Sequence, residues 1–353
     1  MATQAEIYTA VSEKLPKNFP FYDWVPKPLG IIFLVVLFIP IMTVSGAYTV
    51  NSSEMVGGLG IQSEHIAFIS FTTSIGMAAF SPFFYSLVSV RRQKMMSLVG
   101  FSILAIQSYI CANTDSMFVL ALNSLIMGFV RQTLLMCNLF TLIKYGFGIE
   151  ATRNVSPGNE PKDEAGWDAL DTEKKASQPI IYFFFMLLGQ IGTWITAWFA
   201  YNYHWQMVYY AMLGAILVAI LITLLCMPYN PYQTKRSPLS FSKFGNVVVF
   251  CLMCCSFCYV MVYGKVYDWY DDDSIYLATA ICIVSTLLFV YLEKTRRSPY
   301  FMLKAFKSRS IQGGILLFIG LMICNSSSML VNIFVGVGMK TDQIQVAALG
   351  NWV

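Results

Sequence analysis

Long apolar runs separated by polar stretches set the pattern of this chain. A helix that crosses a membrane needs about 20 mostly apolar residues, because lipid offers the backbone no hydrogen-bond partner. The runs lack the two-residue alternation that is typical of membrane strands. Nine segments meet the length requirement, at residues 28–50, 66–88, 95–112, 117–143, 180–200, 207–227, 246–263, 275–292 and 311–337. The pattern therefore predicts an all-α polytopic membrane protein.

The composition also favours a membrane protein, and it excludes some classes of function. The 353 residues are 57% hydrophobic and 12% charged, whereas about 25% of a soluble domain is charged, so a water-soluble enzyme is excluded. Two His and 19 acidic residues leave little material for a His-based metal site or a carboxylate-rich cleft, and the spans contain no His or acid pair. We therefore expect no enzymatic activity, no cofactor, no metal site and no nucleic-acid partner.

Basic residues are distributed unevenly between the two sides of the predicted spans. If the N-terminus is cytoplasmic, 20 of the 23 Lys and Arg fall in inner segments, two (Lys265 and Lys340) fall in outer loops, and Arg131 lies inside a span. Cytoplasmic loops of membrane proteins carry an excess of Lys and Arg. We therefore expect a multi-pass protein of the cell (inner) membrane with a cytoplasmic N-terminus.

Two polar segments are assigned to the cytoplasm on the same basis. Residues 1–27 contain an aromatic cluster that we expect at the membrane interface, formed by Phe19, Phe21, Tyr22 and Trp24. This pattern does not fit a cleavable leader. Residues 148–178 form the longest polar stretch, and we expect a solvated inner loop or an interfacial helix there.

Three stretches carry more specific patterns. The fifth and sixth spans contain closely spaced glycines followed by a Trp that opens the next helix, namely Gly189, Gly192 and Trp205. A basic cluster between the second and third spans consists of Arg91, Arg92 and Lys94. An ordered set runs from the seventh span into the ninth: Gly264, Asp268, Trp269, Ile275, Glu293, Pro299, Phe306, Arg309 and Gly313. Together these stretches resemble the major facilitator superfamily, and in particular its 14-span drug:proton antiporter branch.

The resemblance implies a helical bundle of the major facilitator type. Residues 28–227 would form the N-terminal six-helix bundle, 228–245 a cytoplasmic linker, 246–292 two linker helices and 293–353 the incomplete start of the C-terminal bundle. The family has five more spans, so we expect a truncated chain or a fragment. The resemblance also implies roles in helix packing and gating for Gly189, Gly192, Arg91 and Arg92.

The chain departs from the family at positions that serve proton coupling. Apolar Leu87 and Val88 stand where the inner-loop motif has an Asp, and Gln190 replaces the Pro of the antiporter motif. The acid of the first span falls near Val44, and the Arg of the fourth span falls near Asn123 or Ser124. The resemblance therefore does not extend to the residues that usually serve proton coupling in the family.

Arg131 is the strongest candidate for a site residue. It is the only ionisable residue deep in a span, where a bare charge costs about 2.5 to 3.5 kcal/mol on insertion scales. It could bind an anionic or polar group of a substrate, or tune a neighbouring carboxylate. The alternative is a structural role, in which its guanidinium bonds backbone carbonyls of other helices.

Further polar residues in the spans are candidates for a substrate pathway or for packing between helices. An aromatic and amide lining suits bulky amphipathic solutes. The candidates beside Arg131 are Gln132, Asn138, Gln190 and Trp194 in the fourth and fifth spans, and Asn325 and Asn332 in the ninth. Cys251, Cys254, Cys255 and Cys258 follow helical spacing, and we expect a packing face of small residues there rather than a metal site, because one helix cannot surround a metal ion.

The predicted function is export of hydrophobic or amphipathic small molecules by proton-coupled alternating access. A non-transporting scaffold or sensor of the same fold, or an uptake symporter, remains an alternative. The expected partners are a small-molecule substrate and the lipid bilayer. The resemblance leaves open a periplasmic adaptor and an outer-membrane channel.

Overall fold

The computed structural model describes residues 20–50, 55, 62–80, 83, 93–147, 187–189, 191–192, 194–228, 241–295, 308–309 and 311–320. Every regular element in these ranges is helical, which confirms the all-α prediction for this part of the chain. The helices are α2 (Lys27–Val50), α4 (Ser63–Ala79), α6 (Gln93–Asn113), α7 (Met117–Phe147), α9 (Trp205–Cys226), α10 (Phe241–Tyr263), the short 3-10 helix η2 (Trp269–Asp271) and α11 (Asp273–Thr295).

Within the described ranges, five helical segments are long and apolar enough to cross a membrane. They are Gln93–Asn113, Met117–Leu139, Trp205–Cys226, Phe244–Tyr263 and Asp273–Thr295. Helix α2 covers the whole of the first predicted span. The second, fifth and ninth predicted spans include residues outside the described part. The chain is therefore a multi-pass membrane protein.

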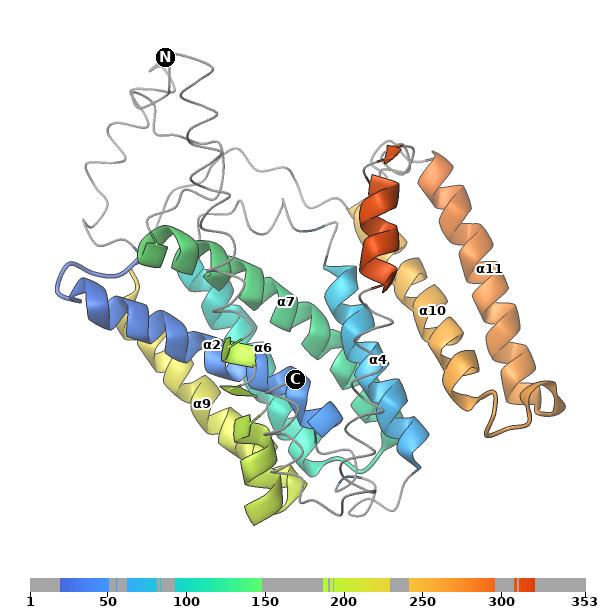
Figure 1. The fold of residues 1–353 in the computed structure, drawn as a ribbon, viewed down its shortest axis with the longest axis horizontal. Coiled ribbons are helices and arrows are strands. Elements are labelled where there is room, and N and C mark those ends of the chain that lie inside the picture. The colour runs from blue at the N-terminus through green and yellow to red at the C-terminus, as the bar shows by residue number, and fades with distance from the viewer. Residues whose placement is uncertain are drawn as a thin grey trace.

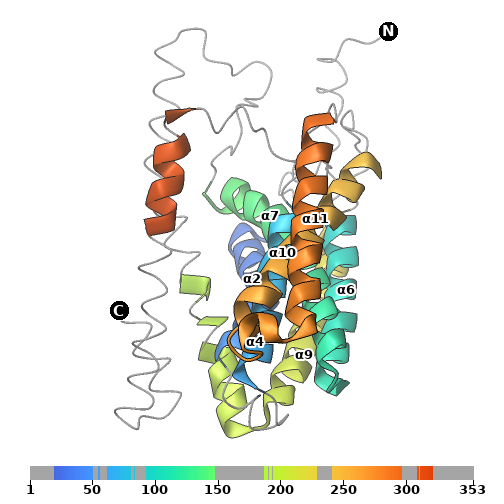
Figure 2. The ribbon, with the colours of Figure 1, turned by 90° about the vertical axis from the view of Figure 1, so that its right-hand side faces the viewer.

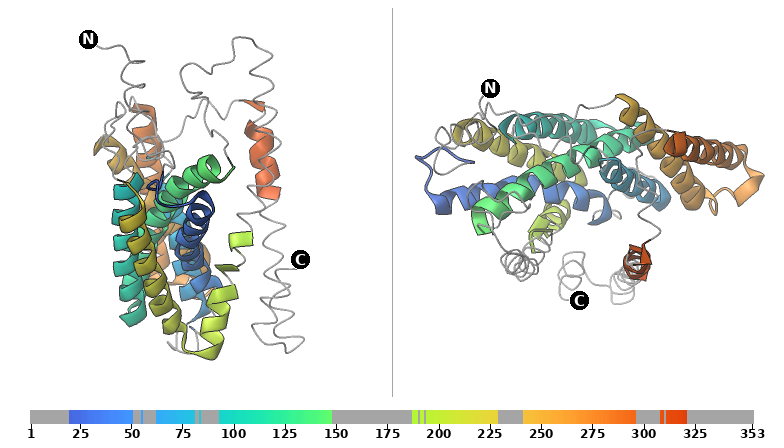
Figure 3. Two further views of the ribbon diagram at one scale, coloured as in Figure 1. Left: turned by 90° about the vertical axis from the view of Figure 1, so that its left-hand side faces the viewer. Right: turned by 90° about the horizontal axis from the view of Figure 1, so that it is seen from above.

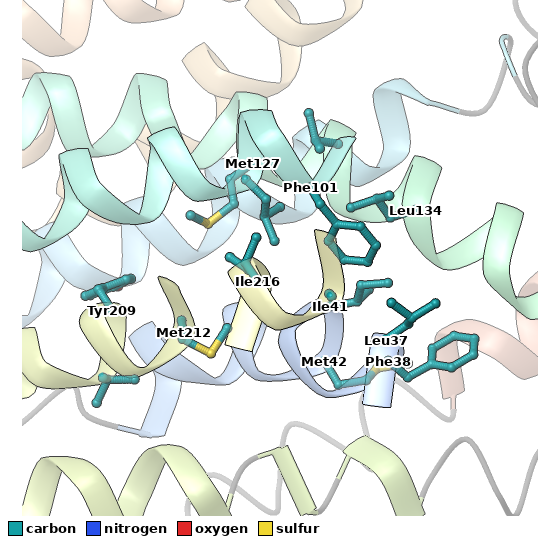
Figure 4. Close-up of a cluster of buried hydrophobic side chains, with 14 of the residues drawn as sticks. Leu37, Phe38, Ile41, Met42, Phe101, Met127, Leu134, Tyr209, Met212 and Ile216 are labelled. Carbon is teal, nitrogen blue, oxygen red and sulfur yellow. The ribbon is translucent and has the colours of Figure 1, made fainter. Parts of the chain in front are cut away.

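Helices α2, α4, α6, α7 and α9 form one bundle (Figure 1). Helix α6 packs between α7 and α9, and α2 contacts α4, α7 and α9. Buried apolar side chains from all five helices belong to a single cluster, to which α4 contributes Ile66 and Ile69. Figure 4 shows part of this cluster, including Leu37, Phe38 and Ile41 of α2, Phe101 of α6, Met127 and Leu134 of α7, and Met212 and Ile216 of α9.

Helices α10 and α11 form a hairpin outside this bundle. Helix α10 packs against α4 and α11 packs against α10, so α11 lies farthest from the bundle (Figures 1 and 3). The short apolar helix Ile311–Gly320 stands apart from both units, and all its residues are exposed (Figure 2). The hairpin turn places Asp272 at the start of α11, where its carboxylate accepts hydrogen bonds from the backbone N–H and the hydroxyl of Ser274.

Phe21 and Val25, just before α2, belong to the core of the bundle. The backbone N–H of Tyr22 donates to the carbonyl of Cys226, and Lys94 Nζ donates to the carbonyl of Leu224, at 3.1 and 2.8 Å. Both bonds satisfy carbonyls at the C-terminal end of α9, which lack partners within their own helix. Phe21 is fully buried, so its side chain packs against protein. Trp24 is exposed, and Phe19 lies outside the described residues.

Candidate functional site

Arg131 joins three helices near the middle of the bundle. Its side chain extends from α7 and is only 8% exposed. Nε donates a hydrogen bond to the carbonyl of Ile41 on α2 at 2.8 Å, and a terminal guanidinium nitrogen donates to the sulfur of Met77 on α4 at 3.2 Å. Both described partners are uncharged. Because a guanidinium stays protonated in proteins, Arg131 places a positive charge at the junction of α2, α4 and α7.

The segment of α2 that Arg131 contacts contains a proline within a continuous helix. Pro40 lies inside α2 and has no N–H to donate to the carbonyl one turn earlier, which weakens the helix at this point. Thr43 donates its hydroxyl to the carbonyl of Ile39 at 2.8 Å and contacts the sulfur of Met212 on α9. Such backbone bonding by Thr also tends to bend helices. Residues 40–43 are all buried, so the weakened segment is enclosed by its neighbours.

Helices α4 and α7 touch backbone to backbone beside Arg131. A Cβ added to Gly76 would lie 1.9 Å from the carbonyl oxygen of Leu125, and one added to Gly128 would lie 2.0 Å from that of Thr73. No side chain fits at either position. Gly76 immediately precedes Met77, and Gly128 lies three residues before Arg131, so this close approach positions the Arg131 contact with α4.

The two predicted packing glycines of the fifth span, Gly189 and Gly192, differ in how closely other helices approach them. A Cβ on Gly192 would lie 3.2 Å from the backbone nitrogen of Thr43 and 3.3 Å from the carbonyl carbon of Met42, so Gly192 lies against the enclosed segment of α2. A Cβ on Gly189 would meet no described atom within 4 Å. The expected close approach at Gly189 is therefore not seen within the described residues.

Among the described residues, no hydrogen bond joins Arg131 to the other predicted site residues, Gln132, Asn138 and Trp194. Asn138 is fully buried, and its amide donates to the carbonyl of Leu134 in its own helix at 2.9 Å. Gln132 is partly buried on α7, and Trp194 is 50% exposed. The remaining candidates lie outside the described residues: Arg91, Arg92, Gln190, Asn325 and Asn332.

Sequence reasoning missed Gly76 and Pro40, and it noted Gly128 only as a neighbour of Arg131. A sequence pattern could have identified both glycines. Thr72 and Gly76 on α4, and Ser124 and Gly128 on α7, are pairs of small residues four positions apart, a spacing typical of close helix contacts in membranes. Pro40 could have been recognised as a weak point inside an otherwise continuous span.

The cysteines and acidic residues of the described part form no metal site. No group of three or more His, Cys, Asp or Glu side chains within these ranges could hold a metal ion. Cys251 packs beside the small apolar cluster of Ala79, Phe83 and Val247, where α10 meets α4. Its described neighbours are therefore those of a packing residue.

In comparisons with known proteins, the chain matches no protein-family model and no curated sequence. The functional interpretation consequently depends on the geometry around Arg131. That geometry combines a fixed planar cation, a proline-weakened helix segment and two helices in backbone contact.

Proposed function

We propose that this chain is a membrane transporter of the major facilitator type that exports hydrophobic or amphipathic small molecules by proton-coupled alternating access. The observation that carries the proposal is the placement of Arg131. A cation in the middle of a membrane helix is costly and typically marks a substrate or ion pathway. Here it contacts the α2 segment beside Pro40, where the helix lacks one backbone hydrogen-bond donor.

The contacts around Arg131 are suited to a change of helix position. Arg131 donates a hydrogen bond to Ile41 of α2, and Gly192 lies against the same segment at Thr43. The absence of side chains at Gly76 and Gly128 lets α4 and α7 approach backbone to backbone. Small residues at helix interfaces let helices approach closely, and alternating access requires bundles to rock about such contacts. A ligand that draws the guanidinium away from the Ile41 carbonyl would release the weakened part of α2.

A second candidate function is a non-transporting scaffold or sensor with the same helices. One observation favours it. Both described partners of Arg131 are groups that a purely structural residue would use, and among the described residues no Asp or Glu lies near the middle of a helix. A proton carrier would have to come from residues outside this part of the chain.

Dye efflux distinguishes these two functions. Cells that express the full-length gene are loaded with a fluorescent hydrophobic cation, and efflux is followed with and without a protonophore. Efflux above that of the empty-vector control, abolished by the protonophore, supports the transporter. Efflux equal to the control, from a protein shown to be folded and inserted, supports the scaffold or sensor. Efflux that the protonophore does not change contradicts the proton coupling.

We also propose that the protein resides in the cell (inner) membrane with its N-terminus in the cytoplasm. The excess of Lys and Arg on one side of the spans supports this orientation. The test is the variant Ser156→Cys, in the predicted inner loop 148–178, which lies outside the described residues. A membrane-impermeant thiol reagent should label it in inverted vesicles only, and labelling in intact cells would reverse the orientation.

A further inference from the structure

Three polar side chains of α6 and α7 have buried atoms that lack a hydrogen-bond partner within the described residues. These atoms are Gln93 Nε2 and Ser97 Oγ on α6 and Asn138 Oδ1 on α7. Ser97 and Asn138 are both fully buried. A hydroxyl inside a helix can donate to a carbonyl of the preceding turn, as Thr223 of α9 does with Ala219 at 2.8 Å. Ser97 makes no such bond, so its hydroxyl is left to bind something else.

The contacts between α6 and α7 place Ser97 and Asn138 at the same level of the bundle. The two helices follow one another after the short connection 114–116 and run antiparallel. A Cβ added to Gly100 of α6 would lie 2.6 Å from the side chain of Leu134 on α7, so these two positions face each other. Ser97 lies about one turn before Gly100, and Asn138 lies about one turn after Leu134. Ser97 and Asn138 therefore lie beside one another across the two helices.

Gln93 completes this group. It lies one turn before Ser97 on the same side of α6, because residues four positions apart are neighbours on a helix surface. We call Gln93, Ser97 and Asn138 the polar layer. Gln93 Nε2 offers N–H groups, Asn138 Oδ1 accepts hydrogen bonds, and the Ser97 hydroxyl can do either. A molecule that satisfies the polar layer must therefore both donate and accept hydrogen bonds.

We propose that the polar layer is a binding site for ordered water between α6 and α7. A buried water molecule typically makes about three hydrogen bonds to polar groups that are otherwise unsatisfied. The N–H groups of Gln93 do not suit a metal cation, and the carbonyl oxygen of Asn138 does not suit an anion. Water suits both. This site does not depend on the proposed transport function.

The polar layer lies on the face of α7 that carries Arg131. Asn138 follows Arg131 by seven residues, which is about two turns and about 10 Å of rise, so the two side chains share a face. Ionisable residues within membrane helices typically face the bundle interior or a water-filled cavity. Water in the polar layer therefore lies in the bundle interior on the same face as the buried cation.

A double-mutant cycle in the full chain tests the polar layer. Ser97→Ala and Asn138→Leu each remove a polar partner with little change in size, and reversible denaturant unfolding in detergent compares them singly and together. If water joins the two side chains, each single change leaves a buried partner unsatisfied and shifts the unfolding equilibrium about fivefold toward the unfolded state. The double variant should shift it by about the same factor and not by the product, because both partners are then apolar.

Ser256→Ala is the matched control for the cycle. Ser256 is 8% exposed on α10, outside the bundle, and its hydroxyl donates to the carbonyl of Leu252 at 2.7 Å. Its effect should combine independently with that of Asn138→Leu. A dry polar layer predicts the opposite sign, because removing an unpaired buried polar atom leaves a variant at least as stable as the wild type. That sign, or independent effects of Ser97→Ala and Asn138→Leu, overturns the proposal.

Radiolytic labelling of the wild type detects the water itself and does not require any variant to fold. X-rays convert bound water into hydroxyl radicals, which modify the side chains beside it. Phe101 is fully buried one turn after Ser97, so it should be modified. Phe80 is 2% exposed at the end of α4, which has no comparable contact with α6, and it should not be modified. Equal modification of the two rings overturns the proposal. So does coupling between the variants without modification of Phe101, since that result indicates a direct bond between Ser97 and Asn138.

Discussion

The five-helix bundle and the α10–α11 hairpin are built from similar apolar helices but differ in what covers those helices. In the bundle each helix packs against at least two others. On the hairpin, three side chains of α11 are each more than 60% exposed, namely Leu277, Val284 and Leu287. Among the described elements, α11 packs mainly against α10 and the short helix η2. In a bilayer, lipid covers these side chains. Apolar content alone therefore does not distinguish a helix packed by protein from one packed by lipid.

Polar side chains and glycines distinguish helices packed by protein from helices packed by lipid more clearly than apolar content does. In the bundle, polar groups join helices, as Arg131 does with Ile41 and as Asn123 does with the carbonyl of Gln107 at 2.9 Å. In the hairpin, hydroxyls such as those of Ser256 and Thr279 bond carbonyls one turn back in their own helix. Interhelical polar bonds and glycine contacts thus identify the part of the molecule where a helix packs against other helices rather than against lipid.

The largest effect is expected at the two glycines between α4 and α7. Gly76→Ala or Gly128→Ala places a methyl group about 2 Å from a backbone carbonyl oxygen, so the helices must separate. We expect little folded protein, measured as the monodisperse yield after detergent extraction. Gly214→Ala is the control, because a Cβ there meets no described atom within 4 Å and Ala should add about 0.5 to 1 kcal/mol of stability. Equal yields for all three variants would refute the backbone contact.

The next effect compares a buried side chain of the bundle with an exposed one of the hairpin. Phe101 is fully buried in the α6 core, and its replacement by Ala should cost about 3 to 5 kcal/mol. Leu287→Ala on α11 should cost less than about 0.5 kcal/mol, because its side chain is 66% exposed. Denaturant unfolding in the same detergent measures both values. Equal costs would mean that the hairpin is packed by protein as tightly as the bundle.

A smaller difference in melting temperature is expected between substitutions of the two glycines of the fifth span. Gly192→Leu must displace the α2 backbone at Thr43, so the melting temperature and transport should both fall. Gly189→Leu should change the melting temperature less, because no described atom lies within 4 Å of its Cβ position. A fully active and stable Gly192→Leu variant would show that the contact with α2 is wrong.

The smallest effect concerns the start of α11. The two hydrogen bonds from Ser274 lower the pKa of the Asp272 carboxyl, so this interaction contributes stability above the usual Asp pKa and loses it as the pH falls through the lowered value. Asp272→Ala should speed amide exchange in the first turn of α11 at pH 7 and leave the bundle unchanged. Exchange identical to the wild type would mean that the carboxylate does not cap this helix.

Much of the helical architecture follows from the apolar runs, because lipid requires long helices whatever their neighbours are. Arg131 could also be singled out, since a charge within an apolar run is conspicuous. Its partners could not be predicted. Ile41 contributes a backbone carbonyl and Met77 a sulfur atom, and their positions depend on how α2 and α4 cross α7 rather than on any local pattern.

The role of Arg131 in transport is tested most directly by measuring dye efflux and thermal stability on the same two variants. Arg131→Lys keeps the charge but loses the planar fork that reaches both Ile41 and Met77. We predict near wild-type yield and melting temperature with impaired efflux for Arg131→Lys, and no efflux from a folded Arg131→Leu variant. A fall in melting temperature and yield in step with efflux would make Arg131 a structural residue, because unpaired partners cost about 1 to 3 kcal/mol each. Full efflux by a stable Arg131→Leu variant would contradict both roles.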